Sequence, residues 1–300
     1  MSLKKFITPF YNSVLLIESF FFPVLRSKRL FKKMVGEKCN LSNPQTLNEK
    51  LMYYKLNLYW NRDIVATCAD KYRVREFVKD QGLSFILNDI YGVWNKFEDI
   101  EWDKLPNKFV LKLNTGSGCN LLVKDKNSLV LKDVRKIVNK WFKQKPGLFT
   151  AEQGIYQRIP KKIVAEKFIE TDDGLPPKDY KFFCSYGEVK LLYIGSDRVN
   201  GRTKFDYYYP NWEWIDVKNS HPNAGPIKKP KNYDLLIKYA SILSKRFPLV
   251  RIDFFDVDGT IYFSEITFTH MGCVHPFEPK IFDKKFGELF PDVREALEVK

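Results

Sequence analysis

Residues 250–267 read VRIDFFDVDGTIYFSEIT. Two alternating apolar runs flank Asp258-Gly259, a dipeptide typical of tight turns, so this stretch predicts a β-hairpin. Each arm carries one acid that is out of place on a buried strand, namely Asp253 and Glu265. The fold and the function both depend on whether these two acids lie on the same face.

The length of the turn decides whether the two acids meet. In a three-residue turn Val257 opposes Ile261, and Asp253 then lies opposite Glu265, with Cβ atoms about 5 Å apart. Two carboxylates that close repel each other unless a proton or a cation lies between them, and Mg²⁺ prefers such oxygen ligands. A two-residue turn would direct the acids to opposite faces and leave an ordinary hairpin with a polar outer side. The hairpin alone leaves both interpretations open.

The composition is that of a folded, basic chain. The 300 residues are 44% hydrophobic, which supports a substantial core and excludes a disordered chain. The net charge of +14 favours an anionic partner such as a nucleotide, an acidic lipid or an acidic glycan. No zinc finger, RRM signature or basic arm is present, so we expect no nucleic acid as partner. The five cysteines are an odd number without a close pair, which favours free thiols and a cytoplasmic location.

The first 33 residues combine a very apolar stretch with flanking cations. Glu18 and Pro23 interrupt the stretch, which is therefore shorter than the roughly 20 residues that span a bilayer. No small-residue cleavage site follows it, so we expect no signal peptide. Two interpretations remain. We favour a helical element that packs on the main body, and the alternative is a peripheral helix on an anionic membrane, at the inner face of the cell membrane.

The rest of the chain predicts helices and antiparallel strands in alternation, hence an α+β fold. Helical spacing of apolar residues predicts helices over residues 47–56, 70–79, 130–143 and 235–247. Alternating or continuous apolar runs predict strands over residues 85–93, 108–113, 121–124, 163–169, 179–185 and 188–194.

A second motif, residues 109–120, joins two of these strands through a short glycine-rich loop. Glycine lets the backbone approach a phosphate and present free N–H groups to it. Lys112 on the preceding strand can add a point charge. The motif is not a P-loop, because Gly-x4-Gly-Lys-Ser/Thr is absent and no helix follows directly. On its own, the loop is more typical of a turn than of a nucleotide site.

Several motifs occur together in an order that resembles the ATP-grasp superfamily. They are a lysine that opens a helix, a strand lysine followed by the glycine-rich loop, the strand at 164–169, and the Arg-x-Asp…Glu hairpin. The wording is similar to that of the TupA-like ATP-grasp family in the segments LNEK (47–50), ADK (69–71), KFVLK (108–112), DYKFF (179–183) and EITFT (265–269). This family is associated with teichuronopeptide and other surface-polysaccharide biosynthesis.

The resemblance implies an ATP-grasp fold, in which two antiparallel-sheet subdomains enclose ATP, here with a helical N-terminal extension. It implies a division of the chain into a helical N-terminal region (1–70), the start of the ATP-grasp body (71–107), a small subdomain with the glycine-rich loop and hinge strand (108–170), and a large subdomain with the metal-binding hairpin (171–300).

The resemblance also implies which residues bind ATP. They are Lys71, Lys112, Gly116, Ser117, Gly118, Cys119, Glu166, Lys167, Phe168, Ile169 and Asp179. The two lysines would contact phosphates beneath the loop, and the hinge strand from Glu166 to Ile169 would read adenine. Asp179 would hold the ribose. Alternatives for the ribose are Glu170, Asp172 and Asp173.

The remaining implied roles concern metal and chemistry. Asp253, Glu265 and Thr267 would hold Mg²⁺. The catalytic side chains would be Arg251, Lys112 and Lys181. Further cations in related enzymes come from the loop that here carries Arg198, Arg202 and Lys204.

Two departures from the family pattern lie next to the hairpin. Thr267 stands where the third metal ligand is usually Asn, and residues 270–272 replace a Pro-Gly. His270 in this segment is a candidate base, and residues 270–275 match no standard zinc spacing. Both departures bear on the acceptor pocket more than on the ATP site.

The implied activity is carboxylate–amine ligation dependent on ATP and Mg²⁺, through an acyl phosphate. We expect the carboxylate to belong to a uronic acid of a bacterial capsule or O-antigen polysaccharide, an acidic glycan that is free, nucleotide-linked or lipid-linked. We expect the amine to be an amino acid or another small amine. The alternatives are ATP-dependent phosphoryl transfer to a glycan, and a glycosyltransferase-like or glycan-binding protein without ATP turnover.

Overall fold

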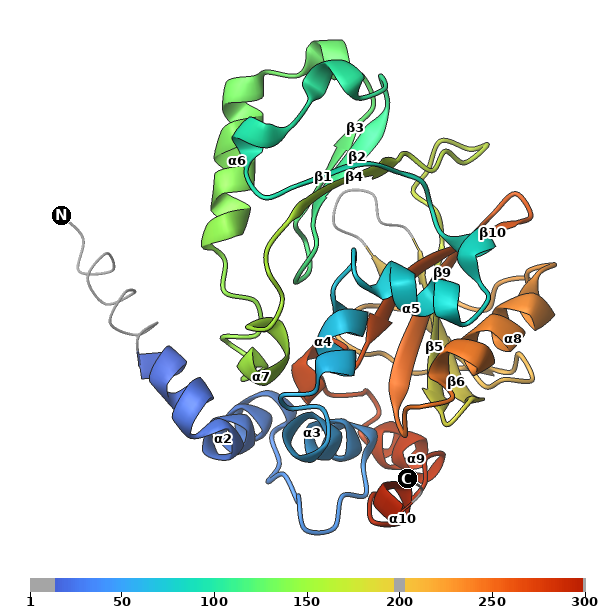
Figure 1. Ribbon diagram of the computed structural model, residues 1–300. Coiled ribbons are helices and arrows are strands. Elements are labelled where there is room, and N and C mark those ends of the chain that lie inside the picture. Colours follow the sequence, from blue (N-terminus) through green and yellow to red (C-terminus); the bar gives the residue numbers. More distant parts are fainter. Residues whose placement is uncertain (1–13, 197–202, 299–300) are drawn as a thin grey trace.

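The computed structural model describes residues 14–196 and 203–298. Arg198 and Arg202, two of the expected loop cations, and residues 1–13 of the apolar N-terminal stretch lie outside the described residues. Two antiparallel sheets organise the described chain, in the strand orders β1-β4-β2-β3 and β10-β9-β5-β6-β7-β8 (Figure 1). This arrangement confirms the expected α+β fold with two antiparallel sheets.

The small sheet consists of β1 (Ile90–Trp94), β2 (Phe109–Leu113), β3 (Asn120–Val123) and β4 (Ile163–Lys167). The large sheet consists of β5 (Asp179–Ser185), β6 (Glu188–Ser196), β7 (Lys204–Tyr208), β8 (Trp214–Ile215), β9 (Val250–Val257) and β10 (Thr260–Thr267). The helices are α2 (Pro23–Val35), α3 (Leu47–Asn57), α4 (Asp63–Ala69), α5 (Val74–Asp80), α6 (Leu131–Lys143), α7 (Gln153–Tyr156), α8 (Tyr233–Ser244), α9 (Ile281–Glu288) and α10 (Glu295–Glu298).

Three details of the predicted elements were wrong. Residues 84–86 form a 3₁₀-helix, so the strand expected from residue 85 begins only at Ile90. The helix expected over residues 70–79 begins only at Val74, as α5, because a turn follows the end of α4 at Ala69. The strands β7 and β8 were not predicted, because their polar and aromatic residues lack a clear period-two pattern.

The β9–β10 hairpin has a two-residue turn, not the three-residue turn that we assumed. Val257 pairs with Thr260, while Asp258 and Gly259 both have positive φ angles of 50° and 86°, as a type I′ turn requires. A turn of this length would direct the two acids to opposite faces. The register shifts between Phe263 and Glu265, however, and this β-bulge restores the pairing of Glu265 with Asp253. The predicted pair is therefore confirmed, although the reason given for it was wrong.

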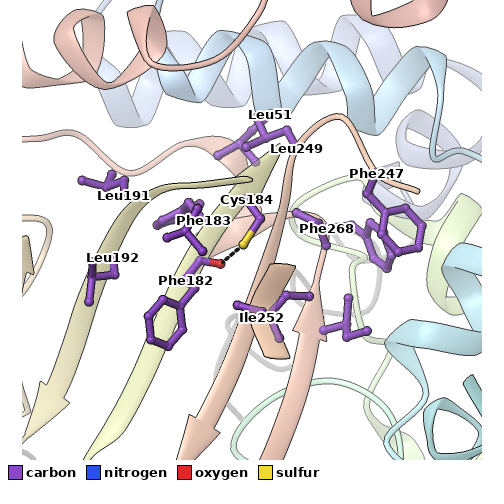
Figure 2. Packing of buried hydrophobic residues seen from close by; sticks show 14 of the residues in the cluster. Leu51, Phe182, Phe183, Cys184, Leu191, Leu192, Phe247, Leu249, Ile252 and Phe268 are labelled. Carbon is purple, nitrogen blue, oxygen red and sulfur yellow. Dashed lines mark hydrogen bonds between the residues drawn. The ribbon is translucent and has the colours of Figure 1, made fainter. Parts of the chain in front are cut away.

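Each sheet has its own hydrophobic core. The larger core packs β5, β6 and β9 against the surrounding helices, and Figure 2 shows Phe182, Leu192 and Ile252 within it. The smaller core packs the small sheet against α6, with Leu111, Val138 and others buried. Two separate cores match two subdomains, and the small sheet draws β1 from the region 71–107, which the sequence places before the small subdomain.

Helices α3 and α9 form a support beneath the large sheet. A capping box at Thr46 and Glu49 begins α3. The Asn48 backbone N–H and side-chain amide donate to the buried Asp283 carboxyl at 3.0 and 2.9 Å. Lys50 donates to the carbonyl of Gly287 at the end of α9 at 2.9 Å. These polar contacts fix one helix against the other.

The five cysteines are free and buried, as expected from the sequence. None of the helices in the described part of the chain is both long and apolar enough to cross a membrane.

Candidate active site

A buried cluster of charges lies on β9 and β10, with Arg251 at its centre. The guanidinium donates to both Asp253 carboxylate oxygens at 2.7 Å. It also donates to Glu265 at 2.8 Å and to the Thr267 hydroxyl at 3.0 Å. A further N–H points at the His270 Nδ1 atom at 2.7 Å. The bulge in β10 is what brings Glu265 to this guanidinium.

Strand β5 adds two further charges to the cluster. Lys181 lies opposite Asp253 in the register of β5 and β9, and its ammonium group pairs with that carboxylate. It also pairs with Asp179 at 2.7 Å. All three side chains are almost completely buried. Asp179 therefore joins the charge cluster, and its assignment to the ribose stays a prediction.

The charges of the cluster depend on each other. Burial raises the pKa of the Asp253 carboxyl, and Arg251 and Lys181 oppose that rise. Burial also raises the pKa of Glu265, but nearby cations, above all Lys71 and Arg251, outweigh it and hold that pKa well below its usual range. Glu265 is therefore an anion at neutral pH, as a metal ligand must be.

His270 does not fit the role of a base. Burial and the neighbouring Arg251 hold its pKa well below the usual range, so the imidazole is neutral. Because arginine can only donate, the His270 Nδ1 atom accepts, and its proton resides on Nε2. The side chain is buried and does not line the cleft. His270 is thus a support for Arg251.

One cleft of about 460 Å³ brings together the loop between β2 and β3 and strands β9 and β10 of the large sheet. The predicted site residues that line it are Lys71, Gly116, Ser117, Arg251, Glu265 and Thr267. Lys71 donates to the Gly116 carbonyl at 2.5 Å, which fixes the lysine under the glycine-rich loop. Gly116 and Gly118 have φ angles of 76° and 72°, a region where glycine carries no steric penalty. The geometry therefore places the glycine-rich loop and the acidic hairpin on one cleft.

Other predicted residues lie outside this cleft. Lys112 pairs with Glu166 at 2.5 Å on the small sheet. The Cys119 side chain is buried in the small core, where its Sγ atom donates to the Gln144 side chain at 3.1 Å. Lys167 is half exposed and pairs with Asp89 at 3.6 Å. Phe168 and Ile169 line a different cavity, which shares no residue with the cleft. The adenine role of the hinge segment stays a prediction.

Comparison with known proteins identifies the family. A family model described as TupA-like ATPgrasp matches residues 49–291. The chain belongs to the TupA-like ATP-grasp family. It is accordingly an ATP-dependent ligase of the general carboxylate–amine class, and its cofactors are ATP and Mg²⁺. None of the curated proteins matches the chain.

Solved structures show a distant likeness to this ATP-grasp protein. D-alanine–D-alanine ligase from Bacillus anthracis, complexed with ATP, is 17% identical, with 78% of this chain and 67% of that chain covered and a TM-score of 0.47. N5-carboxyaminoimidazole synthetase from Staphylococcus aureus is 14% identical, with 67% of this chain and 44% of that chain covered and a TM-score of 0.39. Since both TM-scores are below 0.5, this likeness carries no argument about function.

The oxygen atoms of the ATP-grasp hairpin fit Mg²⁺. Carboxylates and a hydroxyl are the hard ligands that this ion prefers. Glu265, whose side chain is one-third exposed, reaches the cleft beside Thr267. Asp253 lies behind them and is fully buried. The described chain offers no group of three His, Cys, Asp or Glu side chains that could hold a metal alone. An ion bound here would therefore take its remaining ligands from phosphate and water.

Our reading of the sequence missed one part of the cleft wall. Residues 147–156 contribute Thr150, Glu152 and Tyr156, to which we gave no role. The only signal in the sequence is an acid just before an apolar turn, which is too common to indicate a site. The backbone conformation is more informative, because Ala151 has a φ of 55°, a value that costs energy in a residue with a Cβ.

Proposed function

We propose that the protein forms an amide between the carboxylate of a uronic acid and an amine, through an acyl phosphate. One observation supports this proposal: Lys71 and Gly116, which would bind phosphate, line the same cleft as Arg251, Glu265 and Thr267. A nucleotide with its phosphates on the loop would place the terminal phosphate near the acidic hairpin. This combination suits phosphoryl transfer to an acid much better than it suits glycan binding alone.

The residues of the cleft divide the first step between them. Lys71 and the backbone N–H groups of the loop would bind the ATP phosphates. Glu265 and Thr267 would hold Mg²⁺ at the cleft, with Asp253 buried behind them, and the ion would neutralise phosphate charge. Arg251, held at fixed distances by its protein partners, would orient the substrate carboxylate for attack on the γ-phosphorus. A bond forms from the carboxylate oxygen to phosphorus, the bond to ADP breaks, and an acyl phosphate results.

The second step forms the amide. The amine nitrogen attacks the acyl carbon, the bond to phosphate breaks, and inorganic phosphate leaves with the electron pair. Arg251 is in place to stabilise the negative charge that develops on the carbonyl oxygen. Positioning and charge neutralisation supply most of the rate enhancement in such reactions.

Charge supports an acidic glycan as the substrate that is activated. The net charge of +14 attracts polyanions to the protein. We propose a uronic acid of a bacterial surface polysaccharide, free or attached to a nucleotide or a lipid, and an amino acid or small amine as the second substrate. The family's association with surface polysaccharides supports this choice.

Hydroxylamine trapping tests the proposal. The protein is incubated with ATP, Mg²⁺, hydroxylamine and a panel of uronic acids offered as free sugars, UDP-sugars and oligosaccharides. We expect ADP release together with a hydroxamate, because hydroxylamine captures an acyl phosphate. Phosphorylated glycan without hydroxamate would replace the proposal by the phosphotransferase alternative. Glycan binding without any ADP release would contradict ligation altogether and leave a binding protein.

A further inference from the structure

The cleft has a second wall, to which the mechanism has so far given no role. It comes from residues 147–156 and from the segment that follows β10. Its polar and small residues are Thr150, Glu152, Tyr156, Thr269, Gly272 and His275. The carboxylates among the described cleft residues are therefore Glu265, on the hairpin, and Glu152, on this second wall.

The Glu152 carboxylate is held in a fixed position by its own loop. The residue is 6% exposed. Its backbone N–H donates to the Gly147 carbonyl at 2.9 Å, and the Thr150 hydroxyl donates to its carboxylate. A Cβ atom on Gly147 would lie 2.7 Å from that of Glu152, so glycine is required for this approach. The loop thus folds tightly around one acid.

Two further contacts make the second wall rigid. Lys55, which is fully buried, donates to the Thr150 carbonyl at 2.9 Å. A Cβ atom on Gly272 would lie 2.4 Å from the Thr150 side chain, so the segment after β10 packs directly on this loop. Tyr156 also lines the cleft, and its pKa is raised by burial and by the negative charges of Glu152 and Glu265. Its hydroxyl is hydrogen-bonded to Thr269. The tyrosine thereby connects the second wall to the metal hairpin.

The two carboxylates of the cleft differ in their partners. Glu265 is paired with a cation, Arg251, at 2.8 Å. Glu152 is bonded to a hydroxyl, and the charge of the buried Lys55 also acts on it. A buried carboxylate that faces a substrate cleft from a rigid loop is suited to a cationic group of the substrate, because the attraction is strong where water is excluded.

We propose that Glu152 binds the ammonium group of the amine substrate and takes one proton from it, which frees the nitrogen lone pair for attack on the acyl phosphate. The neutral amine then forms the C–N bond, the acyl–phosphate bond breaks, and the leaving phosphate takes the electron pair and the second nitrogen proton. The cleft is thus divided between cations for the acid substrate and an anion for the amine. This inference rests on the proposed ligation and assigns its second substrate site.

Glu152→Gln separates this inference from the ligation itself. Hydroxylamine is neutral at pH 7, so it needs neither an anionic site nor a base. We expect the variant to form hydroxamate within about threefold of the wild-type rate. In the wild type, a pool of amino acids and small amino alcohols should suppress hydroxamate by competing for the acyl phosphate. In the variant, the amine concentration that halves hydroxamate formation should rise at least about 30-fold. Glu152→Asp keeps the carboxylate and should recover part of the lost sensitivity to the amine.

A matched control is Glu188→Gln, which changes an exposed acid on β6. Added amines should suppress its hydroxamate formation as they do in the wild type. If added amines lower the hydroxamate yield equally in Glu152→Gln and in wild type, the inference is overturned. It is also overturned if none of the amines lowers the hydroxamate yield of the wild type. Absence of hydroxamate from the wild type would instead contradict the proposed function.

A different observation carries a second inference, at the N-terminal side of the molecule. Residues 14–21 are helical and lead into α2. Residues 14–25 expose seven large apolar side chains, with 40–70% of each residue accessible: Val14, Ile17, Phe20, Phe21, Phe22, Val24 and Leu25. Ile17, Phe20 and Phe21 among them also line a groove toward residues 144–161. Isolated exposed hydrophobics are normal, but a contiguous set marks an interaction surface.

The same segment is also fixed to the body. Ser19 donates to the Leu148 carbonyl at 3.0 Å, and Arg26 donates to the Phe149 carbonyl at 3.1 Å. Figure 1 shows α2 beside α3, against which it packs. Packing and surface binding, which the sequence presented as alternatives, are therefore compatible, because Ser19 and Arg26 are buried in the contacts while Phe20 and Phe21 stay exposed.

The charged residues around this surface indicate what binds to it. Lys28, Lys32 and Lys33 are exposed just beyond the aromatic residues, and Arg29 pairs with Glu18. An apolar strip bordered by lysines matches a membrane with anionic headgroups. A groove of about 530 Å³ between this helix and residues 144–161 shares Gln144, Pro146 and Tyr156 with the cleft.

We infer that this strip, residues 14–33, docks on an anionic lipid bilayer and places the cleft next to the lipid surface. The test is co-sedimentation of the full chain with vesicles of phosphatidylcholine alone or with one-third phosphatidylglycerol. We expect binding to the anionic vesicles only, and a loss of at least about tenfold in partitioning for the double variant Phe20→Ser/Phe21→Ser.

The control is Phe85→Ser, which removes an equally exposed aromatic residue far from α2 in the sequence. It should bind as the wild type does. Failure of the wild type to bind anionic vesicles, or unchanged binding by the double variant, would overturn this inference. Neither result bears on amide formation, so the two proposals fail separately.

Discussion

The small sheet and the large sheet each carry a lysine that faces a carboxylate, in very different surroundings. On the small sheet, the Lys112 and Glu166 side chains are 27% and 11% exposed. On the large sheet, Lys181 and Asp253 are 9% and 0% exposed and belong to a network centred on Arg251. Solvent screens the first pair, whereas each charge of the second depends on its partners.

This contrast suggests a division of labour between the sheets. A screened lysine can exchange its carboxylate for a phosphate at small cost, as a nucleotide-binding residue should. A buried network keeps its geometry whether or not substrate is present, as the residues that orient a reaction should. Arg251 and Glu265 of the buried network line the cleft, whereas Lys112 and Glu166 lie outside it.

Arg251→Met should break the large-sheet network and produce the largest effect on stability. The substitution leaves the buried Asp253 with Lys181 as its remaining cation, and removal of one partner from a buried ion pair costs about 3–5 kcal/mol. Urea unfolding measures the loss. Arg251→Lys, which keeps the charge, should lose less. A change below about 1 kcal/mol would show that the network is not coupled as described.

Glu265→Gln should separate catalysis from stability within the same sheet. Because Glu265 is partly exposed, we expect a change of less than about 1 kcal/mol in the free energy of unfolding. The hydroxamate rate should nevertheless fall by about 10²–10³-fold, because a charged metal ligand is lost. Paired unfolding and trapping assays measure the two effects. A variant that keeps its hydroxamate rate would disprove the metal role.

Asp283 gives a pH-dependent test of the support beneath the large sheet. Burial raises the pKa of this carboxyl to about 6. The native state therefore favours the protonated acid, and the stabilisation present below pH 4 is lost as pH rises through about 6. The loss should be on the order of 3 kcal/mol. The difference in unfolding free energy between wild type and Asp283→Asn, measured from pH 4 to 7, should show this slope. A flat difference would contradict it.

The Lys112–Glu166 pair should give the smallest effect. A double-mutant cycle with Lys112→Met and Glu166→Gln should yield a coupling energy of about 0.2–1 kcal/mol in urea unfolding, as partly exposed ion pairs do. Lys112→Met should still weaken ATP binding by about tenfold, since a phosphate contact is lost. A coupling energy as large as that of the Arg251 network would erase the contrast between the sheets.

Much of the fold could be predicted from local patterns in the sequence. The hairpin turn signal, the glycine-rich loop and the alternation of apolar residues each predicted an element that the structure contains. The bulge between Phe263 and Glu265 could not be predicted, because nothing in residues 260–267 distinguishes a bulged strand from a regular one. The correct pairing of the acids followed from two errors that cancel, a turn one residue too long and a bulge omitted.

The residues of the site could be predicted only where they belong to the set of family motifs that occur in a fixed order along the chain. Lys71, Gly116 and Glu265 lie in one cleft, although up to 194 residues separate them in the sequence. Glu152 was missed, because its loop closes locally at Gly147 and is held through Thr150 by packing against Gly272, which lies in a distant segment of the chain. Long-range packing of this kind leaves no periodic signal.

The central claim is that the glycine-rich loop and the acidic hairpin form one site for ATP and Mg²⁺. Calorimetric titration with ATP, once with Mg²⁺ and once with EDTA, tests it in wild type, Glu265→Gln and the exposed control Glu188→Gln. We predict that Mg²⁺ strengthens ATP binding at least about tenfold in wild type and control, and that Glu265→Gln abolishes this gain while metal-free ATP binds equally to all three. Equal gains in all three proteins, or no ATP binding to the wild type, would contradict the account.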